Sequence, residues 1–287
     1  YQYQERNQSD TSIEVRLTSP GDEAFRWVGG LYYAYIDRDV VVSQGSDLNQ
    51  GLSARAFVPT SGKNPTDLLY DDTFKTNVYS IFGQLAYDVV DNLELALALR
   101  YDSEQRDVDN NVKTCNSSTP TGCRAQTPLF NFGSNPYINP AYTANNAFAT
   151  DGIPDRSKTF SELQPKLSAN WAVNEEVSLF ASYGFGFRSG GFNSSGSEAT
   201  INQYFGNLFY SPGVPNISGV KDDYESETSE AAEIGMKSIL LDRHLQVNLA
   251  AFYTQVEDLQ FFNFFVGPFG LLRVVTNIDE VTLQGAE

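Results

Sequence analysis

The sequence predicts an all-β fold, an antiparallel transmembrane β-barrel segment of about nine strands plus a remnant of a larger barrel. Three observations predict it. Apolar and polar residues alternate along the chain, the alternating runs are long, and the connections between them are short and long in turn. Side chains on a strand point to opposite faces with a period of two, so each run has one apolar face.

The clearest pair of runs lies at 160–193. Leu163, Leu167 and Trp171 share one parity, and the pattern resumes after the polar turn at 174–176. Each run is longer than the ~5–6 residues usual in a soluble sheet and approaches the ~9–11 residues that cross a bilayer. This stretch therefore predicts a hairpin of two long strands.

The remaining strands are expected at 11–19, 25–37, 77–89, 93–102, 230–240, 245–253 and 272–287, with 1–8 as the end of a strand cut off by the fragment boundary. In the last strand the apolar parity changes between Ile278 and Val281, which predicts a β-bulge near Asp279. The chain shows no helical period from which a helix would be expected.

The connections separate two all-β architectures. Short ones are expected around Gly21, Asp91, Asn174 and Asp242, and longer ones at 40–75, 103–159, 194–223 and 257–271. Outer-membrane barrels have short turns at one end and longer loops at the other. A soluble carbohydrate-binding β-sandwich, the alternative, has no reason to keep that order, so the order favours a membrane barrel.

Charge and hydropathy exclude two further classes. No apolar run reaches the ~18–20 residues of a membrane-spanning helix. The 19 Lys and Arg residues against 36 Asp and Glu residues give a net charge of −17, which would repel nucleic acid. Nucleic acid is therefore not an expected partner.

The two cysteines, Cys115 and Cys123, lie in one polar loop and do not form a CxxC motif, and the chain has a single histidine. The spacing predicts a disulfide rather than a metal site, with two free thiols as the alternative. The acidic run at 222–230 has no calcium-loop spacing and is interpreted as a solvated junction. No cofactor and no metal site are expected.

Catalysis is not expected either. The only histidine, His244, lies in a short turn, and no GxSxG motif is present. The chain is therefore predicted not to be an enzyme.

Several short motifs, in this order along nearly the whole chain, resemble the barrel portion of TonB-dependent outer-membrane receptors. The quoted pieces are Ile13-Glu14-Val15-Arg16-Leu17-Thr18-Ser19, Trp27-Val28-Gly29-Gly30-Leu31-Tyr32-Tyr33, Leu99-Arg100-Tyr101-Asp102, Gln164-Pro165-Lys166-Leu167, Gly186-Phe187-Arg188-Ser189-Gly190-Gly191-Phe192-Asn193, Tyr224-Glu225 with Glu233-Ile234-Gly235-Met236-Lys237, and Asn277 with Gly285-Ala286-Glu287. Each motif is short, but their order is specific to the family.

The resemblance implies that 1–287 is part of a plugged barrel of about 22 strands in the bacterial outer membrane. It also implies that the plug domain, the energy-coupling box and the closing C-terminal strands lie outside this chain. The expected partners are outer-membrane lipid, the TonB energy-coupling complex acting through the missing N-terminal region, and a solute.

The resemblance further implies energy-coupled uptake of a scarce, bulky solute, most simply a ferric siderophore. An oligosaccharide or another nutrient as cargo remains an alternative, as does a passive porin.

Two groups of residues are candidates for ligand contact. Arg188, where a strand meets the outer loops, either contacts an anionic ligand or pairs with a neighbouring carboxylate. An aromatic loop would be costly if simply exposed, so it either contacts ligand or packs on neighbouring loops or the interfacial girdle. Its residues are Phe261, Phe262, Phe264, Phe265 and Phe269, and Tyr204, Phe205, Phe209 and Tyr210 raise the same question.

Overall fold

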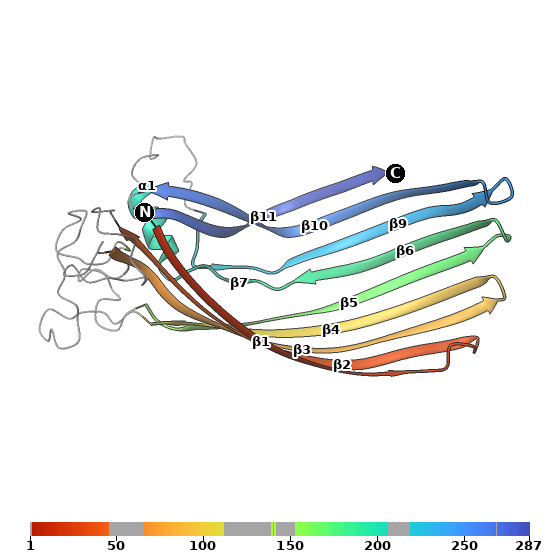
Figure 1. The fold of residues 1–287 in the computed structure, drawn as a ribbon, viewed down its shortest axis with the longest axis horizontal. Coiled ribbons are helices and arrows are strands. Elements are labelled where there is room, and N and C mark those ends of the chain that lie inside the picture. Colours follow the sequence, from red (N-terminus) through yellow and green to blue (C-terminus); the bar gives the residue numbers. More distant parts are fainter. Residues whose placement is uncertain are drawn as a thin grey trace, which may run out of the picture.

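The fold is one open, antiparallel sheet of nine strands in the order β1-β2-β3-β4-β5-β6-β9-β10-β11 (Figure 1). It is seen in a computed structural model that describes residues 2–45, 66–111, 139, 141, 153–205, 219–267 and 269–287. Sheet neighbours are also sequence neighbours except β6 and β9, between which lie β7, the helix α1 and β8.

The elements of the large sheet are β1 (Gln2–Thr18), β2 (Phe25–Gly45), β3 (Thr66–Val90), β4 (Leu93–Asn110), β5 (Arg156–Ala172), β6 (Val177–Arg188), β9 (Glu227–Leu240), β10 (Leu245–Gly267) and β11 (Gly270–Ala286). The strands β7 (Gly191–Phe192) and β8 (Asp223–Tyr224) pair in a separate small sheet, and α1 is Ser197–Phe205. Within the described ranges, no helix has the length and apolarity needed to cross a membrane.

All nine predicted strands are confirmed, and the remnant expected at 1–8 belongs to β1. The four short turns are confirmed too, and all lie at one end of the sheet, here called the turn end (Figure 1, right). Strands β2 to β5 run further than predicted toward the opposite end, the loop end. Polar residues there pair in the ladder although their side chains no longer alternate with apolar ones.

The expectation of no helix is wrong at α1. Its nine residues carry no apolar stripe of helical period, so the sequence pattern could not reveal it. The helix is instead fixed by tertiary contacts, with Ile201 fully buried and the Asp222 carboxylate accepting hydrogen bonds from the amides of Gly196 and Glu198.

The predicted long connection at 257–271 is also wrong. Strand β10 continues to Gly267 and β11 begins at Gly270, so the aromatic segment is part of a hairpin in which Phe265 pairs with Leu272. Phenylalanine and valine favour strands, and pairing satisfies the backbone groups that a loop would leave open. Short and long connections therefore do not alternate throughout.

The irregularity predicted near Asp279 is present, but it is not an extra residue in β11. The ladder lacks the pair between Asp258 and Asp279, while Glu257–Glu280 and Leu259–Ile278 flank the gap in one register. Asp258, on β10, has a positive φ of 52°. The parity of the apolar residues therefore changes at Asp258 of β10, opposite the predicted position at Asp279, and the pairing of β10 with β11 keeps its register.

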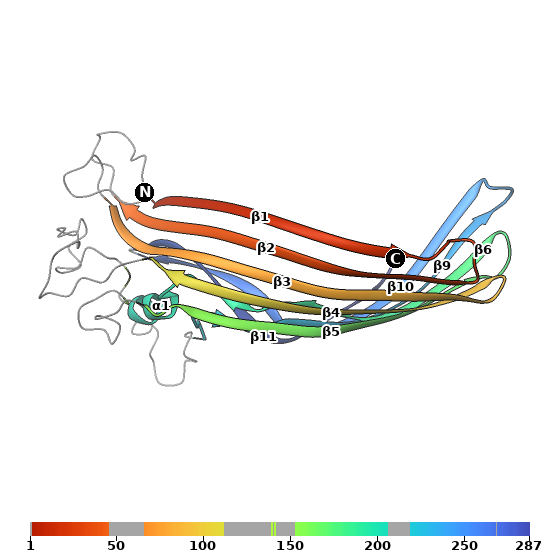
Figure 2. The same cartoon turned by 90° about the horizontal axis from the view of Figure 1, so that it is seen from below.

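The sheet has two chemically different faces. The outer face is defined by large apolar side chains that stay exposed, among them Ile13, Val15, Leu17, Leu31, Tyr79, Ile81, Leu85, Leu97, Leu99, Leu163, Leu167, Trp171, Tyr183, Ile234 and Leu249. Such a surface is expensive in water but is what a strand presents to lipid. Figure 2 shows the sheet curving about its long axis. The face opposite to these apolar side chains is here called the inner face.

Polar groups on the inner face join neighbouring strands. Asp102 of β4 accepts hydrogen bonds from Ser80 Oγ of β3, from Arg100 Nε at 2.8 Å and from Gln164 Nε2 of β5 at 2.5 Å. Two family-like motifs, those containing Arg100 and Gln164, thus meet at one carboxylate. In this structure these residues hold β3, β4 and β5 together.

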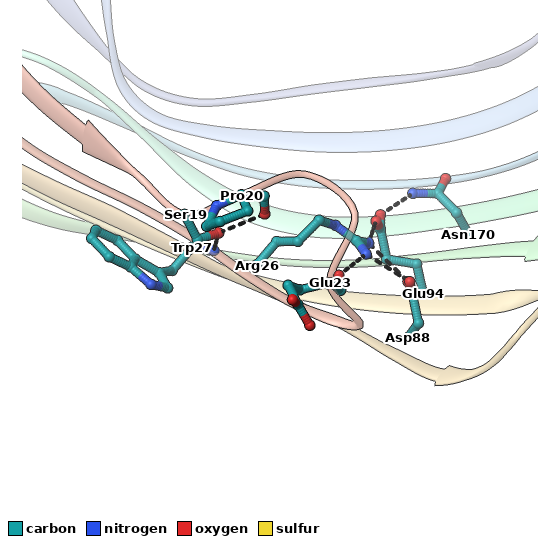
Figure 3. A network of polar contacts seen from close by, with 8 residues as sticks. All are labelled: Ser19, Pro20, Glu23, Arg26, Trp27, Asp88, Glu94 and Asn170. Carbon is teal, nitrogen blue, oxygen red and sulfur yellow. Dashed lines mark hydrogen bonds and ion pairs between the residues drawn. The ribbon is translucent and has the colours of Figure 1, made fainter.

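The turn end is held by a second network, drawn in Figure 3. Arg26, at the start of β2, contacts Asp88 of β3 at 2.6 Å and Glu94 of β4 at 2.5 Å. It also donates to the carbonyl oxygen of Glu23 at 2.8 Å. One guanidinium therefore ties the β1–β2 turn to the next hairpin.

At the loop end the side chains form a buried apolar group, here called the rim cluster. Its buried members are Val40, Val42, Leu69, Tyr70, Ile201, Val220, Phe269, Leu272 and Val274. They come from β2, β3, α1, the segment before β8 and the β10–β11 hairpin, so α1 is packed between two distant parts of the sheet. Gln2 Nε2 also reaches the carbonyl oxygen of Leu271 at 2.9 Å, which links the two edge strands.

Two adjacent glycines on β2 give a matched test of inner-face packing. A Cβ at Gly30 would lie 2.5 Å from the Phe82 ring and 2.7 Å from the Val15 carbonyl oxygen, whereas at Gly29 the nearest atom is 3.8 Å away. We expect Gly30→Val to destabilise the protein by about 1–3 kcal/mol through overpacking. Gly29→Ala should stay within about 0.5 kcal/mol of wild type. Urea unfolding in lipid vesicles measures both, and equal stabilities of the two variants would contradict this packing.

Candidate functional site

Arg188 ends β6 at the loop end, and its side chain is 63% exposed. Its Nη1 atom lies 3.9 Å from Glu227 Oε2 of β9. The expected alternative, pairing with a neighbouring carboxylate, is therefore what the structure contains. The contact is long and exposed, so it holds Arg188 only weakly.

The aromatic candidates fall into two sets. Phe269 is fully buried in the rim cluster, and Tyr204, Phe205 and Phe265 pack against it, with the Tyr204 and Phe269 ring centroids 5.3 Å apart. These four rings have the packing role that was the alternative to ligand contact. Ligand contact by any of them stays a prediction.

The second aromatic set is exposed. Phe261, Phe262 and Phe264 lie on β10, and the Arg273 guanidinium stacks over the Phe262 ring at 4.8 Å. Phe264 pairs with Arg273 across the hairpin, one position from the buried pair Phe265–Leu272. Phe262 and Phe264 therefore face away from the rim cluster, whereas Phe261 has the parity of Phe265.

Cys115, Cys123, Phe209 and Tyr210 lie outside the described residues. The disulfide stays a prediction. In the described part of the chain, no group of three or more His, Cys, Asp or Glu side chains is arranged to hold a metal ion.

Two asparagines from family-like motifs build a joint at the loop end, here called the rim joint and made of Asn193, Asp222, Glu225 and Asn277. Asn193 accepts from the amide of Val275 at 2.8 Å and donates to its carbonyl oxygen at 2.9 Å, like one more strand residue. Asn277 contacts both backbone groups of Glu225, at 2.8 and 3.1 Å. The joint thus fastens the segments around β7 and β8 to β11.

Gly190 and Gly191 allow the chain to make this joint. A Cβ at Gly190 would collide with the Phe160 ring and the Tyr224 carbonyl oxygen, and one at Gly191 would lie 2.6 Å from the Tyr224 hydroxyl. The paired glycines therefore let the chain after β6 lie directly on β5 and β8. In this structure their role is to allow close approach of the chain.

Two carboxylates hold the start of α1. Asp222 accepts from the amides of Gly196 and Glu198, as noted above, and Asp72 of β3 accepts from the amide of Ser195 at 2.8 Å and from Asn110 Nδ2 at 3.0 Å. Asp72 is fully buried. Burial raises the pKa of Asp72 from 3.8 to about 6, against the opposing effect of these hydrogen bonds.

Sequence reasoning missed a set of arginines on the inner face, the lumen arginine cluster of Arg6, Arg38 and Arg106. In the strand ladders, Arg6 pairs with Val40, Arg38 pairs with Gln8 and Phe74, and Arg106 pairs with Thr76, the partner of Ile36. Val40 is buried, and Ile36 and Arg38 share its parity on β2. Paired residues lie on the same face, so the three arginines share the face of Val40. Arg38 stacks over the Phe74 ring at 4.6 Å. All three therefore point into the lumen above the lipid-facing belt.

Arg38 is open to the lumen, yet the surrounding wall removes part of its water. This desolvation lowers the pKa of Arg38, and the positive charges of Arg6, Arg106 and Arg273 lower it further. Like charges held together in a partly desolvated concavity attract an anion.

A sequence signal for this cluster did exist. Arg38 keeps the parity of Arg26, and Arg106 keeps that of Arg100, but both lie in or beside stretches interpreted as loops. On the opposite parity at the same height are Asp37, Asp39, Asp107 and Asp109. The outer surface at this height is therefore mainly acidic, whereas the inner face combines the three arginines with Asp10 and Asp72.

The fold and motifs define a barrel-wall segment of an outer-membrane receptor, and comparison with known families agrees. The chain matches the family "TonB dependent receptor-like, beta-barrel" over residues 1–287 and belongs to that family. Members of the family are outer-membrane β-barrels that act as receptors and transporters.

Solved structures of similar fold include the ferric yersiniabactin uptake receptor FyuA from Yersinia pestis, with 13% identity and a TM-score of 0.60 over 99% of this chain and 32% of that one. The copper transporter OprC has 16% identity and a TM-score of 0.57 over 99% and 36%. The siderophore receptor PiuA from Acinetobacter baumannii has 13% identity and a TM-score of 0.54 over 98% and 35%. The chain thus spans about a third of the length of these proteins, and the similarity shows the fold.

Because Asp72 is buried, we expect the rim cluster and the start of α1 to open more easily at neutral than at acidic pH. Because its pKa is raised from 3.8 to about 6 in the folded state, the folded rim takes up a proton between about pH 6 and pH 4 and the opened rim does not. Stability therefore rises as pH falls through this window, by on the order of 3 kcal/mol for full exposure of Asp72.

Hydrogen exchange of segment 194–201, corrected for intrinsic rates, measures this effect in the full-length receptor. We expect stronger protection at pH 5 than at pH 7.5 in wild type. In Asp72→Asn the difference should be smaller but should not vanish, because burial also raises the pKa of Asp222, which accepts from the amides of Gly196 and Glu198. Equal protection at both pH values in wild type would contradict the assignment.

Proposed function

We propose that the whole receptor carries out energy-coupled uptake of a scarce, bulky, anionic solute, most simply a ferric siderophore. Family membership supports uptake across the outer membrane. Two of the similar structures named above are a ferric yersiniabactin uptake receptor and a siderophore receptor, at 13% identity each. TonB coupling would act through regions that lie outside this chain.

The lumen arginine cluster is the observation that carries the choice of an anionic cargo. The chain has a net charge of −17, so three lumen-facing arginines above the lipid-facing belt are an exception to its predominantly acidic composition. Neither Arg6 nor Arg38 forms an ion pair among the residues that the structure describes. Guanidinium groups bind carboxylates and other planar anions through two parallel hydrogen bonds, which suits an anionic chelate.

In this proposal Arg38 and Arg6 are the first groups to meet the cargo, while Arg106 is already shared with Glu104 at 2.9 Å. Arg188 and the exposed rings of Phe261, Phe262 and Phe264 are proposed as additional contacts at the loop end. Aromatic faces of that kind would pack against the flat parts of a bulky ligand.

A charge-removing pair of variants tests the cluster. Arg38→Gln should weaken binding of an anionic ferric siderophore to the full-length receptor by about tenfold or more, because one charge-assisted contact is worth about 1.5–3 kcal/mol. Lys75→Gln is the matched control. Lys75 lies at nearly the same height but on the outer face, paired with Asp109 at 2.6 Å, so its loss should change affinity less than twofold.

Isothermal titration with ferric siderophores of different charge measures both variants. A cargo bound equally well by wild type and Arg38→Gln, with no dependence on salt, would contradict anion recognition. An oligosaccharide that binds under the same conditions would then be the better candidate.

Abundance of the native receptor under iron limitation is an independent check of the cargo class. We expect the amount in outer membranes to rise several-fold when cells are starved of iron. An unchanged amount would argue against iron-chelate uptake and leave the barrel assignment intact.

A further inference from the structure

The ladder between β5 and β6 stops well before the loop end. Strand β6 pairs with β9 along its whole length, and β5 pairs with β4 as far as Arg156. Between β5 and β6, however, the last pair is Lys166–Gly184. By contrast, β3 pairs with β4, and β9 with β10, almost to the loop end of the shorter strand. Residues 156–165 of β5 and 185–188 of β6 therefore border a gap between paired strands, here called the β5–β6 opening.

Pro165 explains where this ladder stops. The Ala172 amide donates to the carbonyl oxygen of Asn92, just before β4, at 2.8 Å. Backbone groups of successive strand residues point to opposite neighbours, so even-numbered amides of β5 point to β4 and odd-numbered ones to β6. Proline has no N–H group. Pro165 therefore costs no bond to β4, but it removes the donor that would continue the ladder to Phe185.

The next donor on this edge of β5 is held by a side chain. The Leu163 amide donates to the carboxylate of its own neighbour, Glu162, at 3.1 Å. Glu162 thus stands in for the carbonyl oxygen of a missing strand. With Pro165 lacking an N–H group and Leu163 bonded, the opening leaves no free amide of β5 in the rows of the lipid-facing belt.

Above the belt the same edge of β5 is unprotected. Ser157, Thr159 and Ser161 have small, exposed side chains, and Thr159 is level with Gln105, where the outer face is polar. Proteins commonly block an exposed strand edge with an outward lysine, a proline or a bulge. The one lysine in 157–163, Lys158, lies on the inner face, and the ladder with β4 is regular there. This edge can therefore accept another strand.

A hollow of about 250 Å³ lies in the opening. Its walls include Glu162 and Leu163 of β5, Phe185 of β6, Glu230 of β9 and Glu257 of β10. Among the described residues that line it, three are glutamates and none is a lysine or an arginine. The opening thus combines a free strand edge with negative charge that no lining cation balances, and a basic group entering the hollow would be attracted.

We propose that this edge of β5 accepts one extended strand of a partner protein, and that the strand places a lysine or arginine in the hollow. The backbone of the added strand replaces the Glu162 carboxylate at the Leu163 amide, and the basic side chain then pairs with that carboxylate. In strand addition of this kind, backbone hydrogen bonds supply affinity and side chains supply selectivity. The lumen arginine cluster takes no part, so the site is independent of the cargo.

The test is titration of the full-length receptor with a fluorescent peptide of alternating threonine and lysine. An analogue with every backbone amide N-methylated has the same charge but cannot pair as a strand. We expect the peptide to bind about tenfold more tightly than the analogue.

Receptor variants locate the binding on β5. Thr159→Pro removes an amide that points into the opening, as Pro165 does, and should weaken peptide binding about tenfold. Glu162→Gln should weaken it about fivefold, because one charge-assisted contact is lost. Asp37→Asn, which removes an acidic group from the outer face of β2, is the matched control and should leave binding unchanged.

Melting temperatures within a few degrees of wild type show that the variants are folded. Equal binding of the peptide and its N-methylated analogue to wild type would reduce the effect to general attraction by an acidic protein and would overturn the proposal. Unchanged binding to folded Thr159→Pro would overturn it as well. Self-association of the receptor that Thr159→Pro abolishes would make a second copy the occupant, and would overturn the assignment to a different partner.

Discussion

The requirement that every backbone N–H and C=O group in a bilayer be hydrogen-bonded is the constraint on which the whole structure depends. Apart from the outer edges of β1 and β11, nine strands meet it with one series of antiparallel ladders, the longest of which runs from Phe25–Tyr87 to Gly45–Thr66. Once the ladder is fixed, side-chain direction follows with a period of two. The lipid face, the inner face and the acidic outer surface above the belt are all consequences of that one arrangement.

The residues that carry the family likeness mostly maintain this wall. Asp102 links three strands of the inner face, and Asn193 supplies backbone-like hydrogen bonds where the chain leaves the sheet. Gly190 and Gly191 leave room for neighbouring segments that a side chain at either position would displace. Motifs of this kind define a family by its architecture and are consistent with cargo differing among its members, because cargo recognition uses other positions.

The loop end is where local pattern and tertiary structure diverge. The aromatic segment that was predicted to be a loop is a paired hairpin, and four of the rings that were candidates for ligand contact or for packing are packed into or against the rim cluster. Burying them removes the cost of exposing them to water, and it also gives α1 an apolar surface to fold on. The arginines that do face the lumen were hidden in stretches without alternating hydropathy, where only strand pairing reveals which face a residue occupies.

The fold class, the nine strands of the large sheet and the four short turns could be predicted from the sequence alone, because a two-residue period and turn chemistry are local properties. The order of the motifs indicated the family. Tertiary structure decided the continuation of β2 to β5 beyond the belt, the helix α1, the break at Asp258 and the lumen arginine cluster. These depend on which distant segment supplies a hydrogen-bond partner or an apolar contact. A polar strand, a short helix and an inward-facing arginine look alike in a single sequence, and their neighbours distinguish them.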